Sequence, residues 1–358
     1  MSYSRLSTGR ELIEVSLIEK MSKVYKHILV IRLSAMGDVA MTVPVLRAFT
    51  KQYPDVKLTV LTRGFLAPFF RDLENVEVFP ADLKGRHKGF PGLYKLSKEL
   101  KQLDIDAVAD LHNVLRSNIL KQFLRNLPFK QIDKGRKEKK ELVTGKHFKQ
   151  LKTTHERYAD VFRTLGFDVD LANPVFPPQA ILKESVLKIT GTKKGKWIGI
   201  APFAAHESKM YPLEQMKQVV KEVSRDYKVL LFGGGQKEIE RLNGLEDKDQ
   251  VVNLAGKLSL DEELDVISNL DVMLSMDSGN AHLAAMLGVK TVTIWGVTHP
   301  FAGFAPFNQP TDFCLLANRE TFPLIPTSVY GNDYPEGYEM AAGSISENRI
   351  VDKIKAVI

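Results

Sequence analysis

The chain has 358 residues, of which 44% are hydrophobic and 26% charged, and its formal net charge is +7. This length and composition suit a globular protein of two ordinary domains. The single cysteine, Cys314, excludes an internal disulfide and a cysteine-based metal cluster. No apolar run approaches the roughly 18 residues that a membrane-spanning helix needs, so any membrane contact would be peripheral.

Residues 1–21 precede the first convincing strand. Charged residues interrupt their apolar positions, which does not resemble a signal peptide. We therefore expect a short N-terminal extension. Together with the single cysteine, this favours a cytoplasmic protein.

The first half alternates short β-branched runs with helical segments, the pattern of a parallel sheet covered on both faces. The predicted strands are 27–33, 57–62, 76–79 and 107–111. The predicted helices are 39–52, 93–103, 114–127 and 154–165. The sequence thus predicts a first α/β domain over residues 22–180.

A proline-rich and glycine-rich stretch from residue 173 to residue 195 is the predicted linker. Strands are then predicted at 197–203, 228–232, 251–254, 271–275 and 291–295, with helices at 213–225, 238–245 and 260–270. This indicates a second α/β domain over residues 181–343, followed by a closing C-terminal helix at 344–358. Ligands of such sheets bind at the carboxyl ends of the strands, so a substrate is expected between facing domains.

The first strand runs into a loop, Arg32 to Asp38, that begins a helix. Gly37 is expected to permit a turn. Asp38 has two interpretations that spacing alone does not separate. It is either a helix cap, a common role of aspartate, or a carboxylate delivered to the interdomain cleft as a general base.

The segment Met276–Gly288 reads as the end of a strand, a tight turn, a helix and a glycine stop. Unpaired N–H groups at the start of such a helix favour an anion such as phosphate. The candidates for donor binding here are Asp277, Ser278, Gly279, Asn280, Ala281 and His282. His282 is either a phosphate donor or a core histidine, and its position favours the first.

Two further loops of the second half follow strands. Ser208 and Lys209 precede a helix that starts after Pro212, and Lys209 could neutralise a phosphate as a point charge. The second loop contains Gly233, Gly234, Gly235 and Gln236. Its glycines would let the backbone approach a base or ribose closely, but it lacks the spacing of a dinucleotide-binding fold, which disfavours NAD.

Much of the positive charge lies between residues 130 and 152. This is either a solvated loop or an electrostatic landing site for an anionic lipid or saccharide. No aromatic-interleaved or zinc-finger pattern supports nucleic acid. Asp104 and Asp106 form an Asp-x-Asp pair at the entry to a strand, where a solvated turn is the better interpretation, so no metal site is predicted.

Four pieces together resemble the lipopolysaccharide heptosyltransferases of glycosyltransferase family 9. They are the loop 32–38, the stretch 110–117, the loop 208–212 and the motif 276–288. The resemblance covers nearly the whole chain from about residue 26. It implies the GT-B architecture, two facing Rossmann-like domains of which the first binds a lipid-linked acceptor and the second an ADP-activated heptose. It also implies inversion at the anomeric carbon without a metal ion or other cofactor.

Position by position, the resemblance implies that Asp38 is the general base, that Lys209 binds the diphosphate and that Asp277 contacts the donor sugar. Ser278 to His282 would form the phosphate-binding turn, with Ser208 and the glycine loop 233–236 completing the donor site. Gln236 and Glu238 fit the acidic ribose contact of the family only approximately. Arg63, Asn113 and Arg116, the last together with the basic loop, are the candidates for holding the anionic acceptor.

The aromatic segment 298–307 follows the donor motif. It would shape sugar specificity or pack at the domain interface.

Two alternatives to the transferase remain at this point. A GT-B nucleotide-sugar epimerase or hydrolase would consume the donor without an acceptor. A noncatalytic nucleotide-sugar-binding protein would use Asp38 only as a cap.

Overall fold

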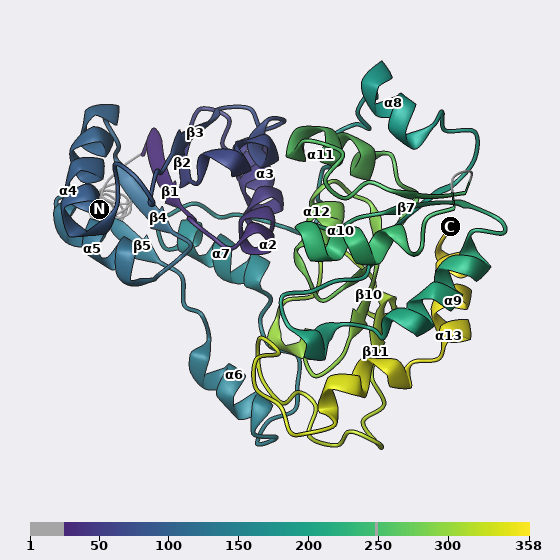
Figure 1. Ribbon diagram of the computed structural model, residues 1–358. Coiled ribbons are helices and arrows are strands. Elements are labelled where there is room, and N and C mark those ends of the chain that lie inside the picture. Colours follow the sequence, from purple (N-terminus) through teal and green to yellow (C-terminus); the bar gives the residue numbers. More distant parts are fainter. Residues whose placement is uncertain (1–24, 248–249) are drawn as a thin grey trace, which may run out of the picture.

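The computed structural model describes residues 25–247 and 250–358 and builds them into two α/β domains, each on its own parallel sheet (Figure 1). The extension predicted for residues 1–21 lies outside the described residues. Within the described part, no helix is long and apolar enough to cross a membrane.

The first sheet has five parallel strands in the order β3-β2-β1-β4-β5. Its strands are β1 (His27–Ile31), β2 (Lys57–Thr62), β3 (Val76–Pro80), β4 (Ala107–Asp110) and β5 (Phe129–Gln131). Ile31 at the end of β1 pairs with Leu61 of β2 and Asp110 of β4. The carboxyl ends of the three central strands therefore meet at one edge, where the loops that follow them gather.

Helices cover both faces of the first sheet. They are α2 (Met36–Ala40), α3 (Thr42–Gln52), α4 (Gly89–Leu100), α5 (Leu115–Phe123) and α7 (Thr154–Arg163), with 3₁₀ turns η1 (Gly64–Phe70) and η2 (Lys101–Leu103). Helix α6 (Arg136–Val143) lies apart from this sheet and packs on η4 (Pro300–Ala302) of the second domain, where Leu142 joins Ala302. α3 and α7 bury Phe49 and Phe162 against one face, with ring centroids 4.7 Å apart. α4 and α5 bury Leu96 and Leu120 against the other. Apolar residues therefore face both ways along the strands, as a covered parallel sheet requires.

The second sheet has six parallel strands in the order β11-β10-β9-β6-β7-β8. Its strands are β6 (Trp197–Ala201), β7 (Lys228–Leu231), β8 (Val251–Asn253), β9 (Val272–Met276), β10 (Lys290–Trp295) and β11 (Cys314–Leu316). Both sheets reverse direction of winding beside their first strand, the point at which open α/β sheets bind ligands.

The helices of the second half also form two layers. They are α8 (Glu184–Thr190), α9 (Leu213–Val223), α10 (Gln236–Asn243), α11 (Leu260–Ser268), α12 (Gly279–Met286) and α13 (Glu347–Val357), with 3₁₀ turns η3 (Glu207–Lys209), η4 (Pro300–Ala302), η5 (Thr311–Phe313) and η6 (Tyr338–Ser344). α13 packs beside α9 on one face of the sheet, and α11 and α12 pack on the other, toward the first domain (Figure 1).

Several short elements differ from the sequence prediction. The basic segment, expected to be a loop, contains helix α6, while β5, α8 and β11 were not predicted. The predicted helix 39–52 is two helices, α2 and α3. Gly37 therefore lies inside α2 and does not make a turn. Short strands and short polar helices carry too little periodicity to be recognised from sequence.

The domains meet through α2 and α12. A β-carbon on Gly37 would lie 3.0 Å from the Cα of Gly279 and 3.2 Å from the ring of His282. Glycine is needed here because the two helix starts are in near contact, whereas Gly288, with φ +80°, is needed to stop α12. Arg71, the residue after η1, pairs with Asp261 and Asp265 of α11 and adds a second interdomain contact.

Candidate active site

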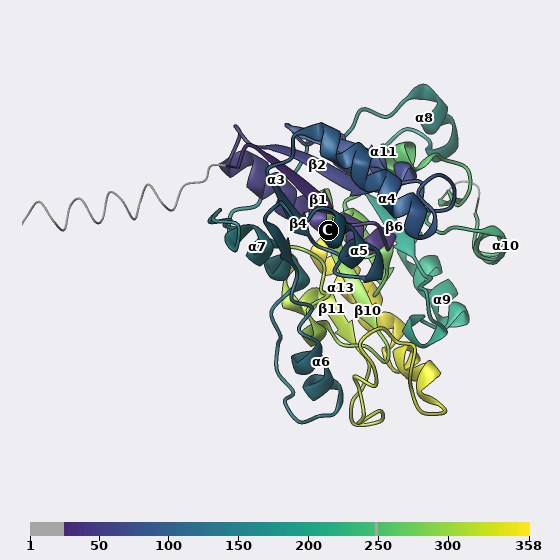
Figure 2. The same ribbon diagram turned by 90° about the vertical axis from the view of Figure 1, so that its left-hand side faces the viewer.

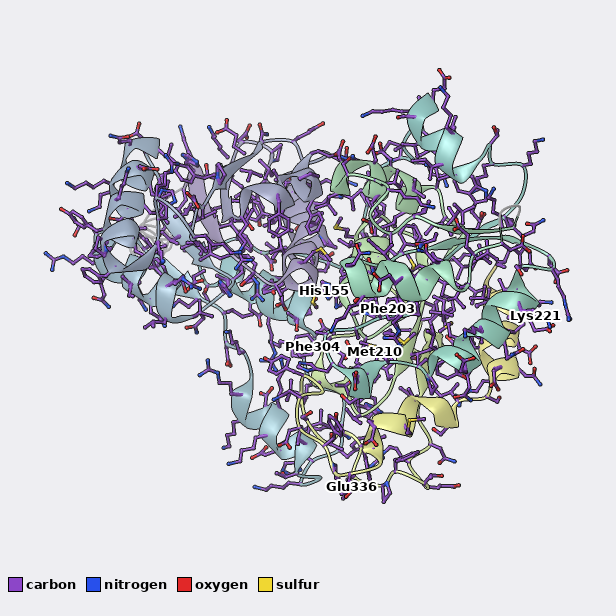
Figure 3. The ribbon with its side chains drawn as sticks, in the orientation of Figure 1. His155, Phe203, Met210, Lys221, Phe304 and Glu336 are labelled. Carbon is purple, nitrogen blue, oxygen red and sulfur yellow. The ribbon has the colours of Figure 1, made fainter. Side chains whose placement is uncertain are left out.

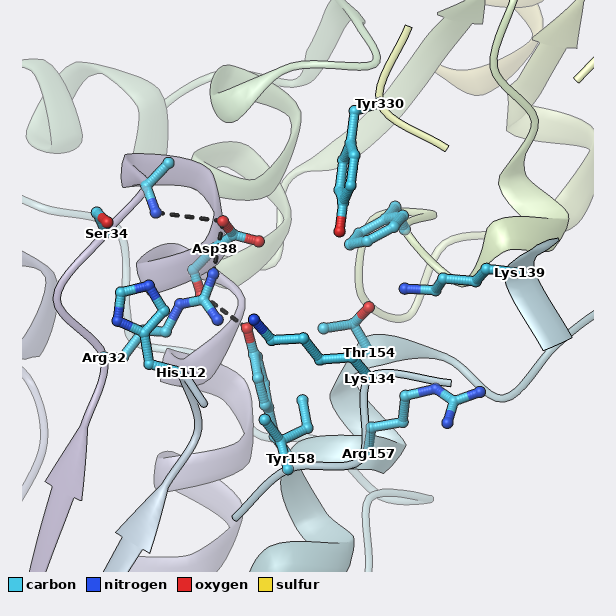
Figure 4. A pocket seen from close by; sticks show the side chains of 13 residues that line it. Arg32, Ser34, Asp38, His112, Lys134, Lys139, Thr154, Arg157, Tyr158 and Tyr330 are labelled. Atoms are coloured by element: carbon cyan, nitrogen blue, oxygen red, sulfur yellow. Dashed lines mark hydrogen bonds and ion pairs between the residues drawn. The ribbon is translucent and has the colours of Figure 1, made fainter. Parts of the chain in front are cut away.

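Asp38 is the third residue of α2, and its carboxylate faces the space between the domains (Figure 4). Its Oδ2 accepts a hydrogen bond from the backbone N–H of Ala35 at 3.2 Å and pairs with Nη2 of Arg32 at 2.6 Å. The helix cap position is occupied by Ala35, so Asp38 is not the N-cap residue that one interpretation predicted. Its side chain keeps 31% of its surface exposed, and both contacts fall on Oδ2, which leaves Oδ1 free of these partners.

Arg32 is held more tightly than its partner. Its side chain is 8% exposed, its Nη1 donates to the carbonyl of Leu111 at 2.8 Å, and its guanidinium lies 5.9 Å from the ring centre of Tyr158. Contacts within the first domain thus hold the guanidinium of Arg32 in place, and this guanidinium in turn orients the carboxylate of Asp38.

A cavity of about 280 Å³ opens beside Asp38, and its lining includes four cations, Arg32, Lys134, Lys139 and Arg157. Lys134, Lys139 and Arg157 reach it from the segment that follows β5, and Tyr330 closes it from the second domain (Figure 4). Asp38 is the only acidic residue in its lining. A cavity of this charge fits an anionic group next to the carboxylate.

Burial changes the ionisation of two groups in this cavity. Desolvation, together with the nearby Arg32, lowers the pKa of His112 to about 3, so its imidazole is neutral at physiological pH. Desolvation and the charge of Arg157 lower the pKa of Lys139 to about 8. The ammonium of Lys139 lies 4.0 Å from the ring centre of Phe304, a cation–π contact between the domains.

The facing wall of the cleft is the start of α12. Ser278 is its N-cap residue, and the next residues, Gly279 and Asn280, open the helix with N–H groups that have no intrahelical partner. Asp277, just before the turn, pairs with Lys209 at 2.8 Å and accepts a hydrogen bond from Thr298 at 2.8 Å. The fold therefore brings Lys209, Asp277 and the helix start together, as the sequence predicted.

Two cavities adjoin this helix start and share Ser278 and Gly279 in their linings. One, of about 200 Å³, is bounded by Asp38, Lys209, Asp277 and His282. The other, of about 350 Å³, extends away from Asp38 along the loop after β7. An anion at the helix start would therefore have room for one substituent toward Asp38 and another toward the glycine loop.

The second cavity is lined by Gly233, Gly234 and two carboxyl groups. Glu238 accepts a hydrogen bond from the N–H of Gly234 at 2.8 Å, and burial raises the pKa of Glu263 to about 7. Sequence reasoning did not find Glu263, because it lies in the first turns of α11, where an acid is an ordinary helix residue.

Four of the predicted donor residues, Ser208, Gly235, Gln236 and Ala281, do not line either cavity at the helix start. Gln236 donates to Glu240 at 2.9 Å on the exposed side of α10, and it is Glu238 that lines the cavity. The hydroxyl of Ser208 is completely buried and donates to the carbonyl of Gly331. Gly235 adopts φ +81° at the start of α10 and is absent from the cavity lining.

His282 lies one turn into α12 and is 8% exposed. Burial lowers its pKa, which keeps the ring neutral. Five buried side-chain polar atoms lack a partner in the part of the chain that the structure describes, and three belong to residues at the cleft: His282 Nδ1, Arg32 Nε and Thr154 Oγ1. Because buried polar atoms are normally paired, this clustering points to a polar ligand in the cleft.

The structure does not bring the three predicted acceptor residues together beside Asp38. Arg63 borders a separate cavity formed by the segments that follow β2 and β3, and Arg116 is exposed in the first turn of α5. The side chain of Asn113 donates to the carbonyl of Ile132 at 3.0 Å and so connects two loops. Lys134 and Lys139 line the cavity instead. Both belong to the basic segment 130–152, for which the sequence left open a solvated loop or a landing site for an anionic partner.

The aromatic segment 298–307 lies at the domain interface, where Phe304 borders both cavities next to Asp38 (Figure 3). Across residues 25–247 and 250–358, no group of three His, Cys, Asp or Glu side chains is placed to hold a metal ion.

A model of the family described as Glycosyltransferase family 9 (heptosyltransferase) matches residues 93–323. The chain belongs to this family. It is therefore a glycosyltransferase, as the sequence predicted.

Sequence relatives extend over most of the chain. A lipopolysaccharide heptosyltransferase 1 of Campylobacter coli is 26% identical over 292 residues, which cover 76% of this chain and 84% of the relative. A lipopolysaccharide heptosyltransferase 2 of Escherichia coli is 25% identical and is covered to 98%, against 92% of this chain.

Solved structures confirm the GT-B architecture. A family 9 glycosyl transferase from Veillonella parvula aligns with a TM-score of 0.72 at 20% identity and covers 93% of this chain and 97% of its own. The heptosyltransferase WaaC of E. coli with ADP aligns with a TM-score of 0.63 at 20% identity, covering 92% of this chain and 97% of its own.

Proposed function

We propose that this glycosyltransferase moves a heptose from ADP-heptose to an anionic, lipid-linked acceptor of the lipopolysaccharide core, with inversion and without a metal ion. The observation that carries this proposal is the cavity shared by Asp38 and the start of α12. It joins a carboxylate to an anion-binding helix terminus, the two groups that such a transfer needs on opposite sides of the reacting carbon. The names of the relatives supply the sugar and the acceptor class.

The arrangement of cavities suggests how the donor would lie. Its diphosphate would occupy the helix start at Ser278 and Gly279, with the sugar toward Asp38 and the nucleoside toward Glu238. The backbone N–H groups and the helix dipole would hold the diphosphate, assisted by Lys209. Since Asp277 already pairs with Lys209, donor binding would place that cation between two anionic groups.

The transfer would proceed as a displacement at the anomeric carbon. The acceptor hydroxyl attacks this carbon and gives its proton to Asp38, while the bond to the diphosphate breaks and its electron pair leaves with ADP. Asp38 would contribute roughly 10²- to 10⁴-fold as a general base. The growing charge on the diphosphate would be met by Lys209 and the α12 N–H groups, which are already in place and need no reorganisation.

The acceptor would enter through the basic cavity. Lys134, Lys139 and Arg157 would hold its anionic groups and place a hydroxyl beside Asp38. We place this reaction on the cytoplasmic side of the inner membrane, where a lipid-linked acceptor is reached by peripheral contact.

The deciding experiment measures ADP release from ADP-heptose in the presence of EDTA, with and without a lipopolysaccharide core acceptor. Release that depends on the acceptor supports the transferase. Release without acceptor would instead indicate the hydrolase or epimerase alternative, and tight binding with no release would indicate a noncatalytic binding protein. Titration of ADP, UDP and GDP under the same conditions tests the nucleotide, and loss of binding in EDTA would contradict the metal-free reaction.

A further inference from the structure

The outer face of the first domain exposes large apolar side chains. Phe90, Tyr94 and Leu115, on α4 and α5, are 62%, 49% and 77% exposed. Phe90 and Tyr94 both lean on the ring of Phe123, with centroids 5.3 and 5.4 Å away, so they form one cluster. Apolar side chains that are exposed as a group, rather than singly, mark an interaction surface.

The same face is strongly basic. Residues 84–101 and 115–125 contain nine Lys or Arg and a single acid, Glu99. Glu99 is 23% exposed and pairs with Arg86 and with His87, both at 3.2 Å. The exposed lysines, among them Lys95 and Lys98, therefore have little acidic charge beside them to offset their own.

We propose that this α4–α5 face, made of residues 84–101 and 115–125, docks on an anionic phospholipid membrane. Aromatic and leucine side chains that enter the headgroup region, surrounded by lysines whose long stems reach the lipid phosphates, are the features of a peripheral membrane surface. A folded acidic protein would match the charge, but it would leave protruding rings such as Phe90 without a complementary pocket.

The position of the α4–α5 face in the molecule also suits docking on a membrane. α4 and α5 cover the side of the first sheet that faces away from the second domain, and they come to the front when the molecule is turned (Figure 2). α5 begins only three residues after His112, which lines the cavity beside Asp38. Docking would therefore bring the basic side of the cleft near the membrane while the second domain stays clear of it.

The proposal goes beyond the transfer reaction and is tested without it, by flotation of the full chain with vesicles. Neutral phosphatidylcholine vesicles are compared with vesicles containing roughly 30 mol% phosphatidylglycerol, a composition that gives the anionic surface in question. We expect binding to the anionic vesicles only, falling steeply with added salt. Binding to both kinds of vesicle alike, or to neither, would overturn the proposal.

Two variants locate the surface. Lys95→Glu/Lys98→Glu is expected to weaken binding by roughly 30-fold or more, because two attractive charges become repulsive. Phe90→Ser/Leu115→Ser is expected to weaken it about tenfold through lost insertion. All four positions are exposed, so circular dichroism and melting should be unchanged.

The matched control is Ile181→Ser/Lys188→Glu, which removes a 95% exposed isoleucine and reverses an exposed lysine of α8 in the second domain. We expect it to bind as the parent does. Equal losses in the control and the α4–α5 variants would contradict a localised surface. Release of ADP from the donor with a delipidated acceptor separates the two proposals, since it should survive in every variant even where vesicle binding is lost.

Discussion

The two sides of the cleft both present groups that attract an anion, but the groups differ in kind. The second domain offers backbone N–H groups at the start of α12, with Asp277 and Ser278 beside them in one continuous stretch of sequence. The first domain offers side-chain cations at residues 32, 134, 139 and 157, drawn from a strand end, a loop and two helices. A site made of backbone N–H groups lies in one short segment and can be recognised in the sequence as a motif. A site made of side chains from distant segments forms only when those segments fold together.

The largest expected effect is at Asp38, where the two walls meet. Asp38→Asn should lower turnover by ~10²- to 10⁴-fold and leave ADP affinity nearly unchanged, because the helix start that would hold the diphosphate is intact. Steady-state kinetics and calorimetry on the same preparation measure both quantities. Near-normal turnover of the folded variant would remove Asp38 as the base.

A smaller effect is expected at Lys209, on the side of the cleft that the second domain forms. Lys209→Ala should weaken donor binding and turnover together by roughly 10- to 100-fold, since a charged hydrogen bond to the diphosphate is lost and Asp277 is left unpaired. Lys221→Ala, on the outer surface of the second domain, is the control (Figure 3). Unchanged ADP affinity in Lys209→Ala would separate this lysine from the diphosphate.

The proposed binding of the acceptor in the basic cavity beside Asp38 can be tested through the ionisation of Lys139. Because its pKa is lowered to about 8, its charge is lost above that pH, and the KM for an anionic acceptor should rise there. Lys139→Met keeps the apolar stem against Phe304 but should raise KM about five- to tenfold at pH 7 and abolish the rise at higher pH. Its exposed neighbour provides the control variant Lys140→Ala. A pH profile that is the same in the parent and Lys139→Met would exclude Lys139 from acceptor binding.

The remaining prediction concerns the stability of the fold rather than turnover, at Glu263, which lines the cavity beside the glycine loop after β7. Burial raises its pKa from 4.5 to about 7, so the unfolded state ionises first as pH rises and folding loses stability between those values. Glu263→Gln does not titrate, and it should therefore gain roughly 3 kcal/mol over the parent between pH 4.5 and pH 8. Urea unfolding at the two pH values measures the difference. An equal pH dependence in parent and variant would mean that the carboxyl is already ionised in the folded protein.

Much of the fold followed from the sequence. Apolar β-branched runs predicted four strands of the first sheet and five of the second, because buried parallel strands must be apolar on both faces. The motif 276–288 predicted a strand, a helix start and a glycine stop, and Gly288 does adopt a positive φ. Local steric and hydrogen-bonding needs fix such features, so neighbouring residues suffice to reveal them.

Tertiary structure alone decided which side chains share the cleft. The sequence pointed to Arg63, Asn113, Arg116 and the basic segment 130–152, and of these candidates folding brought Lys134 and Lys139 to the cavity beside Asp38. The tertiary structure also showed that Gly37 lies where α2 and α12 are in near contact, and that Glu238 lines the cavity beside the glycine loop whereas Gln236 does not. Side-chain convergence depends on the path of the backbone over tens of residues, and neither periodicity nor spacing encodes that path locally.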